Sequence, residues 1–338
     1  MKNVTGCLFT LLMLFNSCIN LEQQNAGRTN GNVINYQLVK DWPQLPDGYT
    51  LGNPTGIGID SNQHIFIFHR AGRKWPLLMP MPRSFITAKT VVMLDRQSGK
   101  IINSWGEGLF IMPHGLTVDQ HNNIWVTDVG LHQVFKFSHE GALLMKLGEA
   151  TVAGSDAAHF NLPTDIAVAG DGSFYVSDGY GNSRVVKFSS SGKYLFEWGK
   201  KGSQPGEFNI PHAIDLDEKG NVYVADRENS RVQAFDTEGN FLKEWKNKSF
   251  GKIYSITISK IKQQLVAVDY SANYLRPKGS DVMVFDSLAN LLSRFGRSAP
   301  AARDRICRYH DVAIDNEENI YVGDIYGNTI QKFTKVLR

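Results

Sequence analysis

Three histidines occur in matching sequence surroundings at equal intervals. His114 lies in MPHGLTVD, His212 in IPHAIDLD and His310 in RYHDVAID, and both intervals are 98 residues. Three imidazoles with a fourth position open to water or substrate are typical of catalytic zinc, whereas structural zinc usually has four protein ligands. The spacing therefore predicts that these three side chains bind one metal ion, if the fold brings them together.

Two alternatives accompany this prediction. A histidine in a strand is more often a hydrogen-bonded structural residue than a ligand, but the equivalent positions of the intervening segments carry other residues, namely Thr55, Thr164 and Ser255. Imidazole also binds iron, cobalt or manganese, so residue type alone does not select zinc. Cys307, three residues before His310, is a further candidate ligand, although no other repeat offers a matching thiol.

A repeat of about 49 residues must position the histidines, since their interval is twice that length. Each unit contains an apolar run ending in Asp, a polar turn, a second apolar run ending in Asp, and a third ending in Phe. The clear copies begin at Gly115, Asp165, Ala213 and Asp311, and weaker copies begin at Gly56 and Ser255. Short alternating runs separated by Asp, Asn and Gly indicate strands joined by tight turns.

Six such units predict an all-β protein, a six-bladed β-propeller. In a closed ring of six, alternate units lie a third of a turn apart, so the histidines face one point on the axis. The segment Tyr36–Val39 precedes the first unit and is expected to supply the outer strand of the last blade, which protects the sheet edges. We predict one domain over residues 33–338.

The first residues are predicted to direct export. Lys2 precedes an apolar run from Cys7 to Phe15, so residues 1–18 are interpreted as a secretory signal. The run is too short to span a bilayer, and the sequence before Cys18 resembles a lipoprotein box, in which Cys18 becomes acylated. Residues 19–32 are expected to be a flexible tether. The protein is thus predicted to be a periplasmic or cell-surface lipoprotein, or otherwise secreted, with the lipid as its only membrane attachment.

Charge excludes one class of partner. The chain has 36 Lys and Arg residues against 33 Asp and Glu residues, a net charge of +3. This balance, without a run of basic residues, argues against nucleic-acid binding.

Several segments together resemble the peptidyl-α-hydroxyglycine α-amidating lyases (peptidylamidoglycolate lyases) of the NHL-repeat propellers. The most telling are Ile65–Arg70, Trp125–Phe137, Val176–Arg184 and Val224–Gln233. The resemblance extends over nearly all of the predicted propeller. It implies a zinc-dependent carbon–nitrogen lyase that cleaves a peptidyl-α-hydroxyglycine, a carbinolamide, into a peptide amide and glyoxylate. Its zinc ligands match His114, His212 and His310.

The resemblance also implies further site residues. Tyr180 matches the family's catalytic base, Arg70 is its charged neighbour, and Arg227 is expected to hold the substrate carboxylate; both arginines are candidate substrate-binding residues. Spacing alone is also consistent with a structural interpretation, in which Tyr180 is an ordinary aromatic residue of a turn and Arg227 an ordinary surface cation. The family's structural calcium ion, bound by two backbone carbonyls and a carboxylate, implies a site at Ile57, Leu116 and Asp311.

Departures from the family concern the surroundings of these residues. The two disulfides of the animal enzymes are replaced by Asn161 with Gly181 and by Tyr223 with Ala234. Before the third histidine, Arg308-Tyr309 replaces the usual Met-Pro. These changes leave the metal ligands in place but are expected to alter the pocket wall and the substrate.

The sequence leaves the natural substrate open. About thirty residues precede the predicted propeller, too few for the family's copper-dependent hydroxylating domain, so a separate hydroxylating enzyme is expected to supply the substrate. A small carbinolamide is an alternative to a peptide. Two other functions also stay open: a non-catalytic NHL propeller that binds a protein or glycan, and a metal-dependent hydrolase or lactonase on the same fold.

Overall fold

The computed structural model describes residues 34–76, 80–273, 276–297 and 306–336. Residues 33–338 form one compact unit. The signal predicted at residues 1–18, the acylation site Cys18 and the tether predicted at residues 19–32 lie outside the described residues. In the described part of the chain we find no candidate for a membrane-spanning helix.

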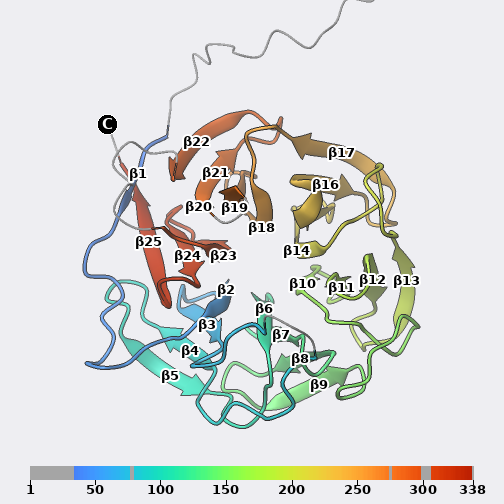
Figure 1. Cartoon of the computed structure of the whole chain (residues 1–338), viewed down its shortest axis with the longest axis horizontal. Helices are drawn as coiled ribbons and strands as arrows, with labels where there is room; N and C mark the ends of the chain where they lie inside the picture. The colour runs from blue at the N-terminus through green and yellow to red at the C-terminus, as the bar shows by residue number, and fades with distance from the viewer. Residues whose placement is uncertain (1–33, 77–79, 274–275, 298–305, 337–338) are drawn as a thin grey trace, which may run out of the picture. The chain divides into compact units, whose positions relative to one another are not determined.

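The described strands form six antiparallel sheets around a ring (Figure 1), which confirms the prediction of a six-bladed β-propeller. Blades 1 and 2 consist of β2 (Pro54–Ile59), β3 (Ile65–His69), β4 (Val91–Leu94), β5 (Ile101–Trp105), β6 (Pro113–Val118), β7 (Ile124–Asp128), β8 (Gln133–Phe137) and β9 (Leu143–Leu147). Blades 3 and 4 consist of β10 (Asp165–Val168), β11 (Phe174–Asp178), β12 (Arg184–Phe188), β13 (Tyr194–Trp198), β14 (Pro211–Leu216), β15 (Val222–Asp226), β16 (Arg231–Phe235) and β17 (Phe241–Lys246), with the 3₁₀ turn η1 (Arg227–Asn229) after β15.

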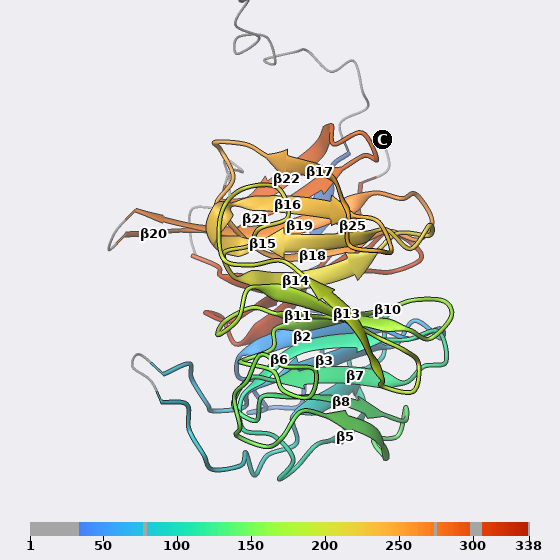
Figure 2. The ribbon, with the colours of Figure 1, turned by 90° about the vertical axis from the view of Figure 1, so that its right-hand side faces the viewer.

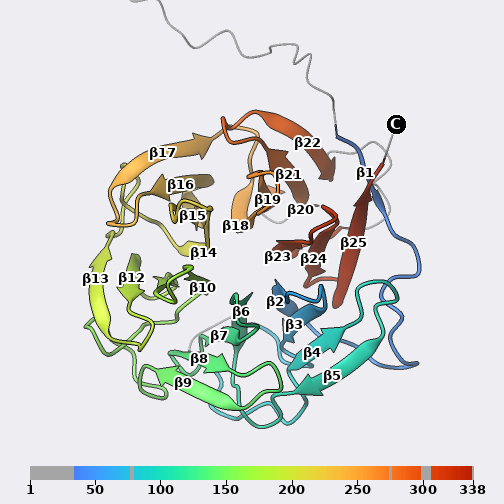
Figure 3. The same cartoon turned by 180° about the vertical axis from the view of Figure 1, so that it is seen from behind.

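Among the described residues, blade 5 has a fifth strand that the other blades lack, and blade 6 closes the ring. Blade 5 consists of β18 (Lys252–Ile258), β19 (Leu265–Asn273), β20 (Arg276–Gly279), β21 (Asp281–Phe285) and β22 (Leu291–Gly296). Blade 6 consists of β23 (Tyr309–Ile314), β24 (Ile320–Asp324), β25 (Thr329–Lys335) and β1 (Tyr36–Leu38). The antiparallel pairing of β1 with β25 confirms the predicted closure without a covalent link, and Figure 3 shows the two strands side by side.

Apolar residues between neighbouring blades form the core. The second strand of each blade is buried on both faces, as in β7, β11 and β15. Between blades 2 and 3, the rings of Trp125 and Phe174 lie 4.6 Å apart and pack with Val176 and Val186. Burying each large apolar side chain contributes roughly 1.5–3 kcal/mol. This packing holds the inner strand of each blade in place around the axis (Figure 1). The inner strands are β2, β6, β10, β14, β18 and β23.

The aspartate that ends the second strand of a unit organises the loop after it. Asp226 is buried at the end of β15 and accepts hydrogen bonds from Asn209 N at 2.7 Å, Asn229 Nδ2 at 2.8 Å and Arg231 Nε at 2.7 Å. In blades 3 and 4 the pairs Asp178–Arg184 and Asp226–Arg231 are thus buried ion pairs that hold the loops at one end of the ring. The turn that starts at Arg227 is one of these loops.

Replacing Asp226 with alanine is expected to lower the free energy of unfolding by about 3 kcal/mol, because the fully buried Arg231 loses its buried acidic partner and keeps only the more exposed Glu244. Asp236→Ala is the matched control: Asp236 also accepts backbone N–H groups, but its turn is exposed. Its cost is expected to stay near 1 kcal/mol. Urea unfolding measures both values, and equal costs would contradict the role given to the buried pair.

The first unit departs from the Asp pattern, because His69 ends β3 where the other units have aspartate. His69 is buried, burial lowers its pKa to about 4, and its Nδ1 accepts the N–H of Ala71 at 3.1 Å. A neutral histidine here accepts a loop N–H, as the aspartates do elsewhere. The long connection that follows, between β3 and β4, projects from the same side of the ring as the β19–β20 hairpin (Figure 2).

Candidate active site

The three histidines meet at the ring axis. His114, His212 and His310 are each the second residue of an inner strand, β6, β14 and β23. Their ring centroids lie 4.7, 4.7 and 5.0 Å apart, and all three side chains are buried. The alternate-blade geometry expected from the interval of 98 residues is therefore present.

A backbone carbonyl of the next blade orients each imidazole. Nδ1 of His114 donates to Thr164 O at 2.7 Å, Nδ1 of His212 to Tyr254 O at 2.6 Å, and Nδ1 of His310 to Thr55 O at 3.1 Å. A proton on Nδ1 leaves Nε2 with a free lone pair, which is the arrangement usual for metal-binding histidines. All three Nε2 atoms are thereby prepared to accept a metal ion.

The surroundings keep these imidazoles neutral. Burial lowers the pKa of all three well below the usual value, and nearby positive charge lowers it further, from Arg70 at His114 and from Arg227 at His212. One ligand atom from each residue lies within 4.8 Å of the others, and Cys307 is not part of the group. Three neutral nitrogen donors with room for a fourth ligand suit a catalytic zinc ion.

Tyr180 lies directly against this group. Its Oη is 3.1 Å from Nε2 of His114 and 2.9 Å from Nε2 of His212, and its ring packs on Trp75 at 4.7 Å. Burial raises the pKa of Tyr180, and this effect exceeds the opposing effect of the charges of Arg227 and Arg70. The arginines alone therefore do not stabilise a phenolate, so the sequence-based account of Tyr180 as a base requires the added charge of a metal ion.

Arg227 is positioned by an acidic neighbour that sequence reasoning missed. Its Nη1 donates to Tyr180 Oη at 3.2 Å, while Nε and Nη2 contact Oε1 of Glu228 at 3.1 and 3.0 Å. Lys252 contacts the other oxygen of Glu228 at 2.5 Å. One edge of the guanidinium is thus already occupied, and only the Nη1 side faces Tyr180.

Arg70 is the more deeply placed arginine. It is 2% exposed, its Nε donates to Pro113 O at 2.9 Å, and the guanidinium lies 5.1 Å from the ring centre of Trp75. Burial lowers its pKa to about 10, so it stays charged at neutral pH. Among the described residues, its Nη2 has no hydrogen-bond partner. A buried cation with an unused donor suits an anionic substrate group.

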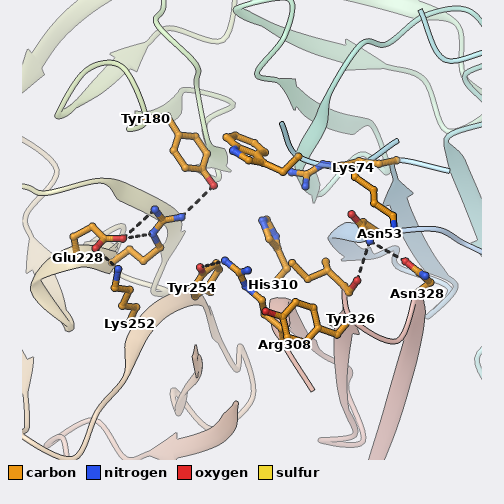
Figure 4. A pocket seen from close by; sticks show the side chains of 14 residues that line it. Asn53, Lys74, Tyr180, Glu228, Lys252, Tyr254, Arg308, His310, Tyr326 and Asn328 are labelled. Carbon is orange, nitrogen blue, oxygen red and sulfur yellow. Dashed lines mark hydrogen bonds and ion pairs between the residues drawn. The ribbon is translucent and has the colours of Figure 1, made fainter. Parts of the chain in front are cut away.

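One pocket of about 510 Å³ is lined by His310, Tyr180, Arg70 and Arg227 (Figure 4). Its wall includes residues that sequence reasoning did not assign to the site: Asn53, Lys74, Trp75, Glu228, Lys252, Tyr254, Ile325, Tyr326 and Asn328. Trp75 and Lys74 come from the connection between β3 and β4, whose unusual length was the available sequence signal. The others come from blades 1, 4, 5 and 6 and have no shared motif.

The predicted calcium residues line a second cavity, which contains none of the three histidines. Asp311 accepts the N–H of Ile57 at 2.5 Å, and burial raises the pKa of Asp311 to about 7. Leu116 lines the same cavity together with two half-buried carboxylates that sequence reasoning missed, Asp165 and Asp215. Asp165 follows Thr164 as Asp311 follows His310, which was a usable signal. Several carboxylates at one cavity suit a divalent cation such as calcium.

The two residue pairs that the resemblance matches to disulfides are adjacent in space. Gly181 N donates to Asn161 O at 2.9 Å, and Tyr223 pairs with Ala234 across β15 and β16.

Comparison with known proteins first defines the class. An NHL repeat model matches residues 110–137, 160–188 and 208–235. A streptogramin B lyase structure superposes with a TM-score of 0.57 at 16% identity, covering 90% of this chain and 89% of that chain, a likeness of fold alone. With its six sheets, this chain is an NHL-repeat β-propeller.

Two curated relatives then identify the particular group. The chain is 36% identical to peptidyl-glycine alpha-amidating monooxygenase A of Xenopus laevis over 87% of this chain and 33% of that protein. It is 33% identical to peptidyl-alpha-hydroxyglycine alpha-amidating lyase 1 of Drosophila melanogaster over 88% of this chain and 59% of that protein. The chain is thus similar to proteins named as α-amidating enzymes, and it spans about a third of the first relative and less than two thirds of the second.

Proposed function

We propose that this protein is a zinc-dependent lyase that cleaves an N-acyl-α-hydroxyglycine, a carbinolamide, into an amide and glyoxylate. The observation that supports it most is the group of three neutral imidazoles with Tyr180 Oη against two of their Nε2 atoms. Homology to named amidating lyases supports the same reaction. Cleavage moves one proton from the hydroxyl to the departing nitrogen while the C–N bond breaks and the C=O bond forms.

The Nε2 atoms of His114, His212 and His310 would hold the zinc ion. When bound, zinc supplies a Lewis acid that makes the substrate hydroxyl more acidic. Tyr180 Oη, adjacent to that position, takes the hydroxyl proton and can pass it to the amide nitrogen. Arg227 orients the phenol through its Nη1, a role that its 3.2 Å contact with Oη supports.

The substrate carboxylate is assigned to the arginines. Arg70 has an unused donor at Nη2 among the described residues, and Arg227 presents its Nη1 side beside Tyr180. Guanidinium groups bind carboxylates through charge-assisted hydrogen bonds. Trp75 covers both Arg70 and Tyr180, which excludes water from that side of the phenol.

Structural calcium, export and substrate supply complete the proposal. Asp311, with Ile57 and Leu116, is proposed to hold a calcium ion in the second cavity, and the crowding of Asp165 and Asp311 supports a cation there. Export, lipidation at Cys18 and a separate hydroxylating enzyme that supplies the substrate stay predictions from the sequence.

Incubating residues 19–338 with N-benzoyl-α-hydroxyglycine and measuring glyoxylate tests the function. We expect release that stops after chelation and returns with added zinc. Absence of glyoxylate from folded, zinc-loaded protein would contradict the lyase assignment and would favour the hydrolase or lactonase alternative.

A further inference from the structure

Arg308 is a pocket residue that the proposed mechanism does not use. It lies two residues before His310 and lines the same pocket. The mechanism assigns the single carboxylate of an α-hydroxyglycine to Arg70 and Arg227. Arg308 therefore adds a third guanidinium group for which this substrate has no second carboxylate.

Tyrosines hold Arg308 in place. Its Nη2 donates to Tyr254 Oη at 2.5 Å, and its guanidinium carbon lies 5.2, 4.7 and 5.7 Å from the ring centres of Tyr254, Tyr270 and Tyr326. Its backbone N–H also donates to Asp324 at 3.0 Å. Aromatic faces attract a cation but do not neutralise its charge. The guanidinium is therefore fixed and still positively charged.

The absence of a carboxylate partner distinguishes Arg308 from the arginines inside the blades. Those pair with buried acids at 2.7–3.0 Å, as in Arg184 with Asp178 and Arg231 with Asp226. Among the described residues, Arg308 forms no ion pair, and its buried Nε has no hydrogen-bond partner. A partly buried cation without an anion is unfavourable by itself, so this arrangement is suited to an anion that arrives with the substrate.

The charge of the whole pocket points the same way. Its wall contains one acidic side chain, Glu228, which already contacts Arg227 and Lys252. Five cationic side chains line it: Arg70, Lys74, Arg227, Lys252 and Arg308. Figure 4 shows Arg308 beside Tyr254, whereas the hydroxyl of Tyr180 lies against Arg227. An anion at Arg308 would therefore be a different group of the substrate from the carboxylate assigned to Arg70 and Arg227.

We propose that Arg308 binds an acidic group on the acyl part of the substrate, so that the preferred substrates are N-acyl-α-hydroxyglycines with a second carboxylate. This inference rests on the proposed lyase function and names its substrate class. Arg308 is a specificity-determining residue in this account, and the planar guanidinium suits a carboxylate.

The test compares N-benzoyl-α-hydroxyglycine with N-(4-carboxybenzoyl)-α-hydroxyglycine. For the native protein, kcat/KM is expected to be about tenfold higher for the acidic compound, the effect of one charge-assisted hydrogen bond. Arg308→Met should bring the ratio close to one, and Arg308→Lys should keep part of it. Lys146→Met, which removes an exposed charge on β9, should leave the ratio at the native value.

A purely structural role of Arg308 would slow both compounds equally in Arg308→Met and keep their ratio, which would overturn the inference. Equal cleavage of both compounds by the native protein would also overturn it, while leaving the lyase function intact. If neither compound is cleaved, the lyase function fails, and calorimetry with N-benzoylglycine and N-(4-carboxybenzoyl)glycine still decides the role of Arg308. If the native protein binds the diacid more tightly and Arg308→Met does not, the proposed role of Arg308 is supported. If the native protein binds both compounds equally, that role is contradicted.

Discussion

The His212→Ala variant is expected to lose the proposed zinc ion, and its rate of glyoxylate release is expected to fall by a factor of roughly 10³ or greater. The expected loss corresponds to the several kcal/mol of transition-state stabilisation that a catalytic metal supplies. His212 is chosen because its Nε2 contacts Tyr180 Oη at 2.9 Å while its Nδ1 contacts Tyr254 O at 2.6 Å. Removing it takes away a ligand and one partner of the catalytic phenol.

Metal content by mass spectrometry and glyoxylate release measure this result on the same samples. His121→Ala is the control, because His121 is an exposed turn residue outside the histidine group; it should retain both metal and activity. Thermal unfolding identifies any loss caused by misfolding. A His212→Ala protein that is folded and still binds one zinc ion per chain with native activity would refute the three-histidine site.

Tyr180→Phe is expected to lower kcat by roughly 10²–10⁴-fold, the usual contribution of a positioned general acid or base, while zinc content stays at the native level. The phenyl ring should keep its packing on Trp75, which lies 4.7 Å away. What disappears is the hydroxyl that contacts His114, His212 and Arg227. If kcat falls while zinc stays bound, the loss is therefore due to proton transfer and not to loss of the metal ion.

Tyr194→Phe is the matched control for this substitution. Tyr194 packs beside the core between blades 2 and 3 and does not line the pocket, so loss of its hydroxyl should leave kcat near the native value. Zinc analysis accompanies both kinetic measurements. If Tyr180→Phe turns over at the native rate with zinc bound, the proton acceptor must be another group, and Tyr180 would be only a wall of the pocket.

The contacts of Arg227 change how a carboxylate can bind. Because Glu228 occupies the Nε and Nη2 edge, Arg227 cannot offer that edge as a fork without breaking an existing ion pair. Arg70 has an unused donor at Nη2 among the described residues. We therefore assign more of the carboxylate binding to Arg70 than the sequence alone suggested.

The sequence by itself determined the ring and the main residues of the candidate site. Alternating apolar residues, turn residues and a period of about 49 positions are local properties, so they predicted six blades and the closure by Tyr36–Val39. Both are present, with the closing strand β1 at Tyr36–Leu38. Equal intervals in a closed ring also required the three histidines to converge. Tyr180, Arg70 and Arg227 became candidates through family resemblance, and the structure brings all three to the same pocket.

Only the tertiary structure decided how these groups are oriented and paired. The carbonyls that hold the three imidazoles lie 50, 42 and 255 positions away in the chain, and no residue type marks them, because any residue has a backbone carbonyl. The contact of Lys252 with Glu228 and the contacts of Arg308 with Tyr254 and Tyr270 likewise depend on side-chain directions at the ends of different blades. Such contacts leave no periodic pattern in the sequence, since they arise only when the closed ring sets neighbouring blades side by side.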